Sequence, residues 1–265
     1  MNKTTERLIF IGLALLVAVG GYLWWKRQEP PPSAAAKAEA PPAPAPAPAE
    51  PPIEHPVPQA EPSVPLPALA DSDAAIRKSL AGAVGEKVLG EFLIASGIIR
   101  KIVATVDNLP RPQLSQKILP VRSPGGSFVV TGTGDSAVIG ADNAARYAPY
   151  VAAAEAIDIG KLVEVYVRFY PLFQQAYREL GYPKGYFNDR LVQVIDHLLL
   201  TPEIKGPIRV AQPKVLYEFA DPELQSRSAG QKLLMRIGVD NAQRVKAKLR
   251  EIRRAVARSE VAKPN

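Results

Sequence analysis

The pattern of apolar and polar positions divides the chain into a short apolar run, a proline-rich stretch and a long region of mixed periodicity. The apolar run is Leu8–Trp25, and apolar residues beyond the proline-rich stretch recur mostly at helical spacing. We therefore expect four parts along the chain: an N-terminal transmembrane anchor at 1–27, a Pro/Ala-rich disordered linker at 28–68, a mainly helical globular domain at 69–258, and a disordered tail at 259–265.

The apolar run has the length and the flanks of a membrane-spanning helix. Its 18 uncharged residues span roughly 27 Å, close to the hydrocarbon thickness of a bilayer. A cleaved signal peptide is the alternative, but the run ends in Trp24-Trp25-Lys26-Arg27 without the small residues of a cleavage site. Two Lys or Arg residues lie on each side of the run, so the distribution of positive charge does not decide the orientation of the helix in the membrane. The short N-terminal tail favours a single-pass protein of the inner membrane with its domain outside the cytoplasm, in the periplasm.

The linker is defined by its proline content. Fifteen of the 27 prolines fall between Glu29 and Ala68. Proline at this density disfavours helix and sheet and favours polyproline II, so these 40 residues reach at most about 120 Å at 3.1 Å per residue. The segment is therefore expected to hold the domain away from the membrane, although any disordered linker has a similar composition.

The domain pattern predicts a series of helices and one small β-hairpin, which places the fold in the mainly α class. Two β-prone runs, Ser127–Thr131 and Ser136–Ile139, surround a Gly-Thr-Gly-Asp turn, and Leu216–Phe219 is expected to be a short strand or extended. The helices are expected from about Asp73, at Glu86–Ile94, at Gly97–Val106, from Ala144, from Asp158, at Phe187–Leu200, at Pro222–Ile237 and at Asp240–Arg258.

Composition narrows the possible chemistry. The chain has no cysteine and two histidines, of which His55 lies in the linker. Disulfides, Cys-ligated metals and a cysteine nucleophile are excluded, and no multi-histidine metal site is possible within one chain. The phosphate-loop, dinucleotide-binding and GxSxG motifs are also missing from the sequence. We therefore predict neither a metal site nor a cofactor.

Aromatic residues are concentrated before and after a turn in the middle of the domain. Eight of the 18 aromatic residues lie in Tyr166–Phe187, and Tyr166, Tyr170, Phe173 and Tyr177 share one helix face. We expect this stripe to form the core side of an amphipathic helix, in which Pro171 starts a new helix or makes a kink. The alternative is an aromatic-lined groove for a sugar ring or a peptide.

The same region and the last helix supply the candidate functional residues. Asp189 and Asp196 lie two helical turns apart, about 10 Å, and His197 is the only histidine of the domain. This set would serve an envelope hydrolase, but a lone histidine near a helix end is more often structural, and we assign no catalytic residue. The candidate binding residues are Tyr170, Tyr177, Tyr182, Tyr186, Asn188, Asp189, Arg190, His197, Arg250 and Arg254.

The last predicted helix is strongly basic. Between Asp240 and Arg258 it carries seven basic and two acidic residues, while Val245, Leu249, Ile252 and Val256 form an apolar stripe. The basic face is either simply solvated or contacts an anionic lipid or wall component. No aromatic residue is interleaved with these charges, so we do not expect nucleic acid as a partner. The favoured function is a non-enzymatic binding or scaffold module in the cell envelope, with an envelope protein as another possible partner.

Several sequence stretches together resemble an uncharacterised bacterial family, classed as a domain of unknown function. The resemblance runs from about Leu66 to Ala257, and it implies an N-terminal membrane segment and a Pro/Ala-rich spacer but no activity. No catalytic residue is carried over from it. The stretches that carry it are IVATVDNLP (102–110), NAARYAPY (143–150), YPLFQQAYRELGYP (170–183), FNDRLVQVIDHLL (187–199), VLYEFAD (215–221) and SAGQKLL (228–234).

The predicted anchor can be tested by topology. A reporter that is active only outside the cytoplasm, fused after Asn265, is expected to be active, because a short tail ahead of Leu8–Trp25 favours export of the following domain. The fusion should also remain in the membrane pellet after a carbonate wash. Activity of a cytoplasm-only reporter would reverse the orientation, and release by the wash would indicate cleavage of the apolar run.

Overall fold

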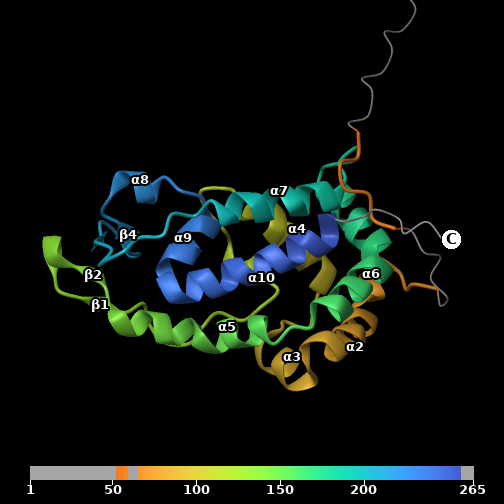
Figure 1. Cartoon of the computed structure of the whole chain (residues 1–265), viewed down its shortest axis with the longest axis horizontal. Helices are drawn as coiled ribbons and strands as arrows, with labels where there is room; N and C mark the ends of the chain where they lie inside the picture. The colour runs from red at the N-terminus through yellow and green to blue at the C-terminus, as the bar shows by residue number, and fades with distance from the viewer. Residues whose placement is uncertain (1–51, 59–64, 258–265) are drawn as a thin grey trace, which may run out of the picture. The chain divides into compact units, whose positions relative to one another are not determined.

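The computed structural model describes residues 52–58 and 65–257. The predicted anchor, most of the linker and the tail lie outside these residues. Within the two described ranges, no helix has both the length and the apolar character needed to cross a membrane. The described part is mainly helical and includes two short pairs of antiparallel strands (Figure 1), so the predicted mainly α domain with a small β-hairpin is confirmed.

Helices and short strands follow one another along the described chain. The α-helices are α2 (Asp73–Val84), α3 (Glu86–Phe92), α4 (Ile98–Asn108), α5 (Ala148–Glu155), α6 (Ile159–Glu179), α7 (Phe187–Leu199), α8 (Pro222–Gln225), α9 (Ala229–Arg236) and α10 (Val239–Ala257). Four 3₁₀ helices are η1 (Leu69–Asp71), η2 (Gln116–Ile118), η3 (Gly134–Ser136) and η4 (Ala141–Tyr147). The strands β1 (Val130–Thr131) and β2 (Val138–Ile139) form the first pair, and β3 (Val210–Ala211) and β4 (Glu218–Phe219) form the second.

Three of the predicted elements differ from the structure. The helix expected from Ala144 is a 3₁₀ helix that begins at Ala141 and continues into α5. Pro171 does not start a new helix, because α6 runs through it. The helix expected at Pro222–Ile237 is divided into α8 and α9, since the Ala229 and Gly230 amides donate to the Arg111 and Leu109 carbonyls instead of continuing a helical ladder.

A carboxylate from one helix caps the start of another. The Asp73 side chain in α2 accepts hydrogen bonds from the Gly97 and Ile98 amides, at 2.7 and 2.8 Å. These amides belong to the first turn of α4, where helix geometry leaves them without an intrahelical partner. Gly97 has a φ of 63°, a left-handed conformation that glycine adopts without strain. This contact fixes α4 against α2 at the side of the main core.

The largest apolar core lies between α2, α4, α6 and the start of α7. Phe169 and Phe187 are among its most buried members, Phe173 is 5% exposed, and the rings of Phe173 and Phe187 stack with their centroids 5.8 Å apart. Tyr170 and Tyr177 are also buried, and Tyr166 is partly buried. The predicted role of the aromatic stripe as the core side of α6 is therefore confirmed.

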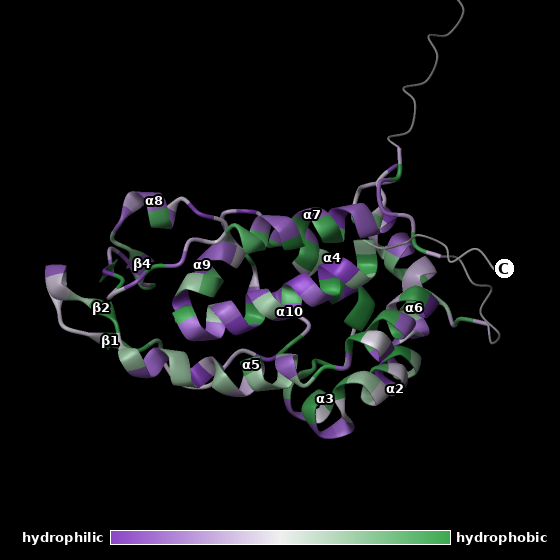
Figure 2. Cartoon of the chain, viewed as in Figure 1, coloured by the Kyte–Doolittle hydropathy of each residue, from purple (hydrophilic) through white to green (hydrophobic). Residues whose placement is uncertain are grey.

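The last helix, α10, packs against four other helices of the domain. It contacts α5, α6, α7 and α9, and its apolar residues Val245 and Leu249 pack on a second core cluster with Leu198 and Leu234. Figure 2 shows that the rest of α10 is mostly hydrophilic. A third cluster, with Val210 and Phe219 as its most buried members, lies at the two strand pairs, which Figure 1 places together at one end of the described domain.

Truncation of one ring of the stripe tests the core. We expect Phe173→Ala to lower the free energy of unfolding by about 3–5 kcal/mol, because it removes a ring that is 5% exposed and leaves a cavity. Denaturant unfolding of the full chain in detergent, followed by circular dichroism, measures the change. Glu164→Ala on the exposed side of α6 is the control, with an expected effect within about 0.5 kcal/mol. Equal stability of the two variants would contradict a core role for Phe173.

Candidate functional site

The structure brings most of the candidate binding residues together where α6, the turn at 180–186 and the first turn of α7 meet. Seven of the ten lie in this region, namely Tyr170, Tyr177, Tyr182, Tyr186, Asn188, Asp189 and Arg190. His197 lies in the last turn of α7, and Arg250 and Arg254 lie on α10. The candidates therefore form one cluster and two separate positions.

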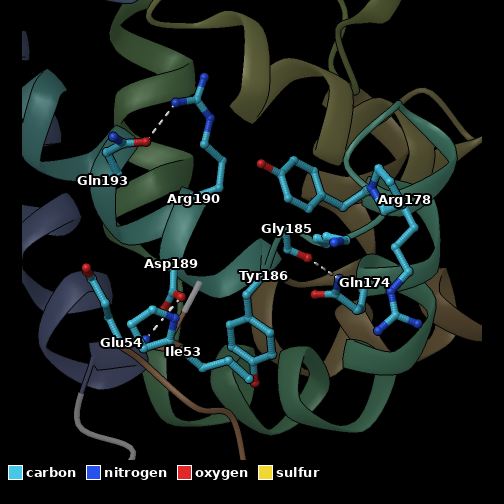
Figure 3. A pocket seen from close by; sticks show the side chains of 13 residues that line it. Ile53, Glu54, Gln174, Arg178, Gly185, Tyr186, Asp189, Arg190 and Gln193 are labelled. Carbon is cyan, nitrogen blue, oxygen red and sulfur yellow. Dashed lines mark hydrogen bonds between the residues drawn. The ribbon is translucent and has the colours of Figure 1, made fainter. Parts of the chain in front are cut away.

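The cluster is occupied by residues 52–58 of the chain itself, which we call the strap. The Asp189 carboxylate accepts hydrogen bonds from the Glu54 and His55 amides at 3.1 and 2.7 Å, and the Tyr186 hydroxyl accepts one from the Val57 amide at 2.8 Å. Figure 3 shows Ile53 and Glu54 of the strap beside Asp189 and Tyr186. The sequence assigns this segment to a disordered linker, but the structure places it against the domain.

Asn188 joins the strap to two helices. Its side chain is 0% exposed, and its Nδ2 donates to the His55 carbonyl of the strap at 2.8 Å and to the Val256 carbonyl of α10 at 3.0 Å. Its Oδ1 accepts a hydrogen bond from the Tyr166 hydroxyl at 3.0 Å. A buried amide that is fully hydrogen-bonded costs little, whereas loss of one partner leaves a desolvated polar group.

A second amide shapes the turn that precedes α7. Gln174 Nε2 donates to the Gly185 carbonyl at 2.7 Å, and its Oε1 accepts from the Tyr170 hydroxyl and the Phe187 amide. A Cβ on Gly185 would lie 2.8 Å from Cε1 of Tyr177, so glycine allows the turn to pass over that ring. The turn thereby delivers Tyr186 and the start of α7 to the strap.

Burial keeps the two inner tyrosine hydroxyls protonated. Desolvation raises the pKa of Tyr170 and of Tyr166 well above the usual value. The pKa of Tyr170 is raised further by its proximity to Tyr186. Both hydroxyls act as hydrogen-bond donors, to Gln174 and Asn188. The two hydroxyls therefore position the side chains of Gln174 and Asn188, and they are unsuited to take a proton from a substrate.

Arg190 faces away from the strap and pairs with a buried carboxylate. Its Nε lies 3.1 Å from Oδ1 of Asp107, which is 1% exposed, and its Nη2 donates to the Asp107 carbonyl at 2.9 Å. The other carboxylate oxygen accepts from Arg111 at 2.7 Å and from the Tyr182 hydroxyl at 3.1 Å. Asp107 was not among the candidate residues. Its position four residues after Val103, on the apolar face of α4, is the sign in the sequence of a buried ion pair.

An open cleft of about 420 Å³ adjoins the N-terminal end of the strap. Gln174, Arg178, Lys184 and Gln193 contribute to its wall, together with Ile53 and Glu54 of the strap; Arg178 and Arg190 lie toward different sides of it in Figure 3. Among the residues that the structure describes, neither Arg178 nor Lys184 forms an ion pair. The cleft thus presents the cations of Arg178 and Lys184 and the side-chain amides of Gln174 and Gln193 to a ligand. The carboxylate of Asp189, which also lines the cleft, is bonded to the strap.

The three residues of the hydrolase alternative have separate structural partners. Asp189 holds the strap, and Asp196 pairs with Arg253 of α10. His197 Nε2 lies 2.8 Å from Oγ of Ser228, which also caps α9 by accepting from the Gln231 amide.

Among the described residues, the pair of His197 and Ser228 lacks the third group that would orient the imidazole as a general base. Burial, and secondarily the charge of Arg190, lowers the pKa of His197. No carboxylate in ranges 52–58 and 65–257 bonds its ring. The same ranges contain no group of three or more His, Cys, Asp or Glu side chains that could hold a metal ion.

Most cations of α10 are engaged with neighbouring groups. Arg244 pairs with Glu155, and the ammonium of Lys246, which is buried, donates to the Thr201 carbonyl at 2.6 Å. Lys248 pairs with Glu251 at 2.9 Å. Within the described chain, Arg250 and Arg254 are exposed and form no ion pair, so the predicted basic face is smaller than the sequence suggests.

Two aspartates with different surroundings provide a test of this arrangement. We expect Asp107→Ala to lower the free energy of unfolding by about 3–5 kcal/mol, because it leaves the partly buried Arg190 without its partner. Asp196→Ala breaks an exposed pair and should cost at most about 1 kcal/mol. Denaturant titration of both full-length variants compares them. Similar, small effects would show that the Asp107–Arg190 pair does not support the site.

Comparison with known proteins identifies the family. A family model described as a protein of unknown function, DUF3014, matches residues 98–253. No curated protein and no solved structure matches the chain. The expected membership of an uncharacterised family is confirmed for this range, and the predicted anchor and spacer lie outside it. Because the match covers more than half of the sequence, the chain belongs to the DUF3014 family.

Proposed function

We propose that this protein is a membrane-anchored, non-enzymatic binding module of the cell envelope whose strap site receives a segment of another protein. The observation that carries the proposal is the docked strap itself. Three main-chain amides and one carbonyl of the strap are bonded to the side chains of Tyr186, Asn188 and Asp189. A surface built to satisfy the backbone of a non-helical segment is suited to peptide recognition.

The chemistry of the site favours binding over catalysis. A hydrolase needs a nucleophile or base that is free to act on a substrate. Here both carboxylate oxygens of Asp189 accept backbone hydrogen bonds, and Asp196 and His197 are bonded elsewhere. No observation brings these three groups to one place, and the hydrolase alternative therefore receives no support.

The location within the envelope rests on the sequence. The uncharged run Leu8–Trp25 supports an inner-membrane anchor, and the short preceding tail supports a domain outside the cytoplasm. The exposed Arg250 and Arg254 support an additional contact with an anionic lipid or wall component. Both remain part of the proposal.

A crosslinking experiment tests the binding role. We expect a photo-reactive amino acid in place of Lys184, in the wall of the cleft, to crosslink the full chain to another protein in growing cells. Asp189→Ala should reduce that product about tenfold or more, because hydrogen bonds to a charged group contribute roughly 1.5–3 kcal/mol each. Asp196→Ala, on the same helix, is the matched control and should leave the product unchanged. Crosslinks to the strap alone would contradict the proposal.

A further inference from the structure

We propose that the strap is a displaceable occupant of its site, and that the preferred ligand is a partner segment with a longer apolar side chain, such as leucine, where the strap has Val57. This inference rests on the proposed function, because it names the ligand class of the same site. It draws on how the strap is recognised, on the space beside Val57 and on the competition between an attached and a free segment.

The hydrogen bonds that hold the strap are made by its main chain and not by its side chains. The hydrogen bonds that hold it use the amides of Glu54, His55 and Val57 and the carbonyl of His55. In the described part of the chain, none of the strap side chains forms an ion pair. Another segment with the same backbone path can therefore make the same bonds.

Val57 is the apolar anchor of the strap, and it fills its place incompletely. Its side chain is 7% exposed and joins the main core cluster. A hollow of about 80 Å³ adjoins it, lined by Val57, Pro58, Val163, Tyr166, Val167, Ala255 and Val256. The side chains that line it are apolar apart from the Tyr166 hydroxyl, which is bonded to Asn188. A longer aliphatic side chain therefore gains contacts and disturbs no hydrogen bond.

A larger, partly open apolar pocket lies close to the hollow. It measures about 140 Å³, lies between α2, α4, α6, α7 and α10, and shares Val163, Tyr166 and Val256 with the hollow. The hollow beside Val57 can thus accept more apolar volume than the strap supplies, and a second apolar pocket lies near it.

The attached strap determines which segments can compete. A segment joined to its site by a short connection acts at an effective concentration in the millimolar range. Each added buried methylene strengthens binding about fourfold, so a free segment with leucine competes at about a quarter of that effective concentration. The strap of a second copy carries the same Val57 and has no such advantage. We therefore assign the site to a partner protein and not to a second copy.

Hydrogen exchange in the full chain tests the fit at Val57. We expect the amides of Glu54, His55 and residue 57 to exchange about fourfold more slowly in Val57→Leu, and more than tenfold faster in Val57→Ala. Ile53→Val is the control, because it removes one methylene from a residue that is 53% exposed, and it should change exchange less than twofold. Faster exchange in Val57→Leu would overturn the inference.

Binding of free peptides separates this inference from the proposed function. Val57→Asp places a charge at a buried position and should vacate the site of the full chain. A labelled peptide of residues 52–58 should bind this variant, and its leucine version should bind about fourfold tighter. Both peptides should bind the unmodified chain more weakly. If the two peptides bind with equal affinity, the preference for leucine is wrong, and the proposed function still stands. If each peptide binds the unmodified chain as tightly as the Val57→Asp chain, the strap does not compete for the site. If neither peptide binds up to 1 mM, the proposed function is contradicted.

Mixing two variants tests the second-copy alternative. The Asp189→Ala chain retains a strap but has a damaged site, and the Val57→Asp chain has a vacant site. We expect no heterodimer between them at 10 µM in sedimentation velocity. A heterodimer would overturn the assignment to a partner protein.

Discussion

The site depends on the buried pair between Asp107 and Arg190. Successive residues of a helix point about 100° apart, so holding Arg190 toward α4 fixes the directions of Asn188 and Asp189 at the same helix end. These two residues then face the strap and α10. A carboxylate and a guanidinium taken from water are costly unless both are well hydrogen-bonded. Asp107 and Arg190 meet this condition with help from Arg111 and Tyr182.

The helices and the first hairpin could be predicted because their signals are local. The period of apolar residues in α4 and α7 and the glycine-rich turn between β1 and β2 lie within a few residues of the structure they determine. The core role of Phe173 followed from the same period. The division between α8 and α9 was missed, since it depends on carbonyls of Leu109 and Arg111 that are more than 100 residues away in the sequence.

Three of the candidate residues contact the strap, and the strap itself was not foreseen. Asn188, Asp189 and Tyr186 were singled out as polar and aromatic residues around a turn, and in the structure their side chains are hydrogen-bonded to the strap. The strap was missed because its bonds use main-chain groups, which composition does not reveal, across a separation of about 130 residues. The charge of α10 was overestimated as a free surface for a similar reason: Arg244, Lys246 and Lys248 have partners that only the packed structure brings near.

Docking of the strap also changes how far the domain can travel from its proposed anchor. The sequence has 23 residues between Glu29 and the strap, which can reach at most about 70 Å, compared with at most about 120 Å for the whole predicted linker. For a domain held by the proposed anchor, the accessible volume scales with the cube of this maximum distance, so release of the strap would enlarge it about fivefold. When a partner occupies the site in place of the strap, the free linker would therefore become longer, and the local concentration of the domain near the membrane surface would fall.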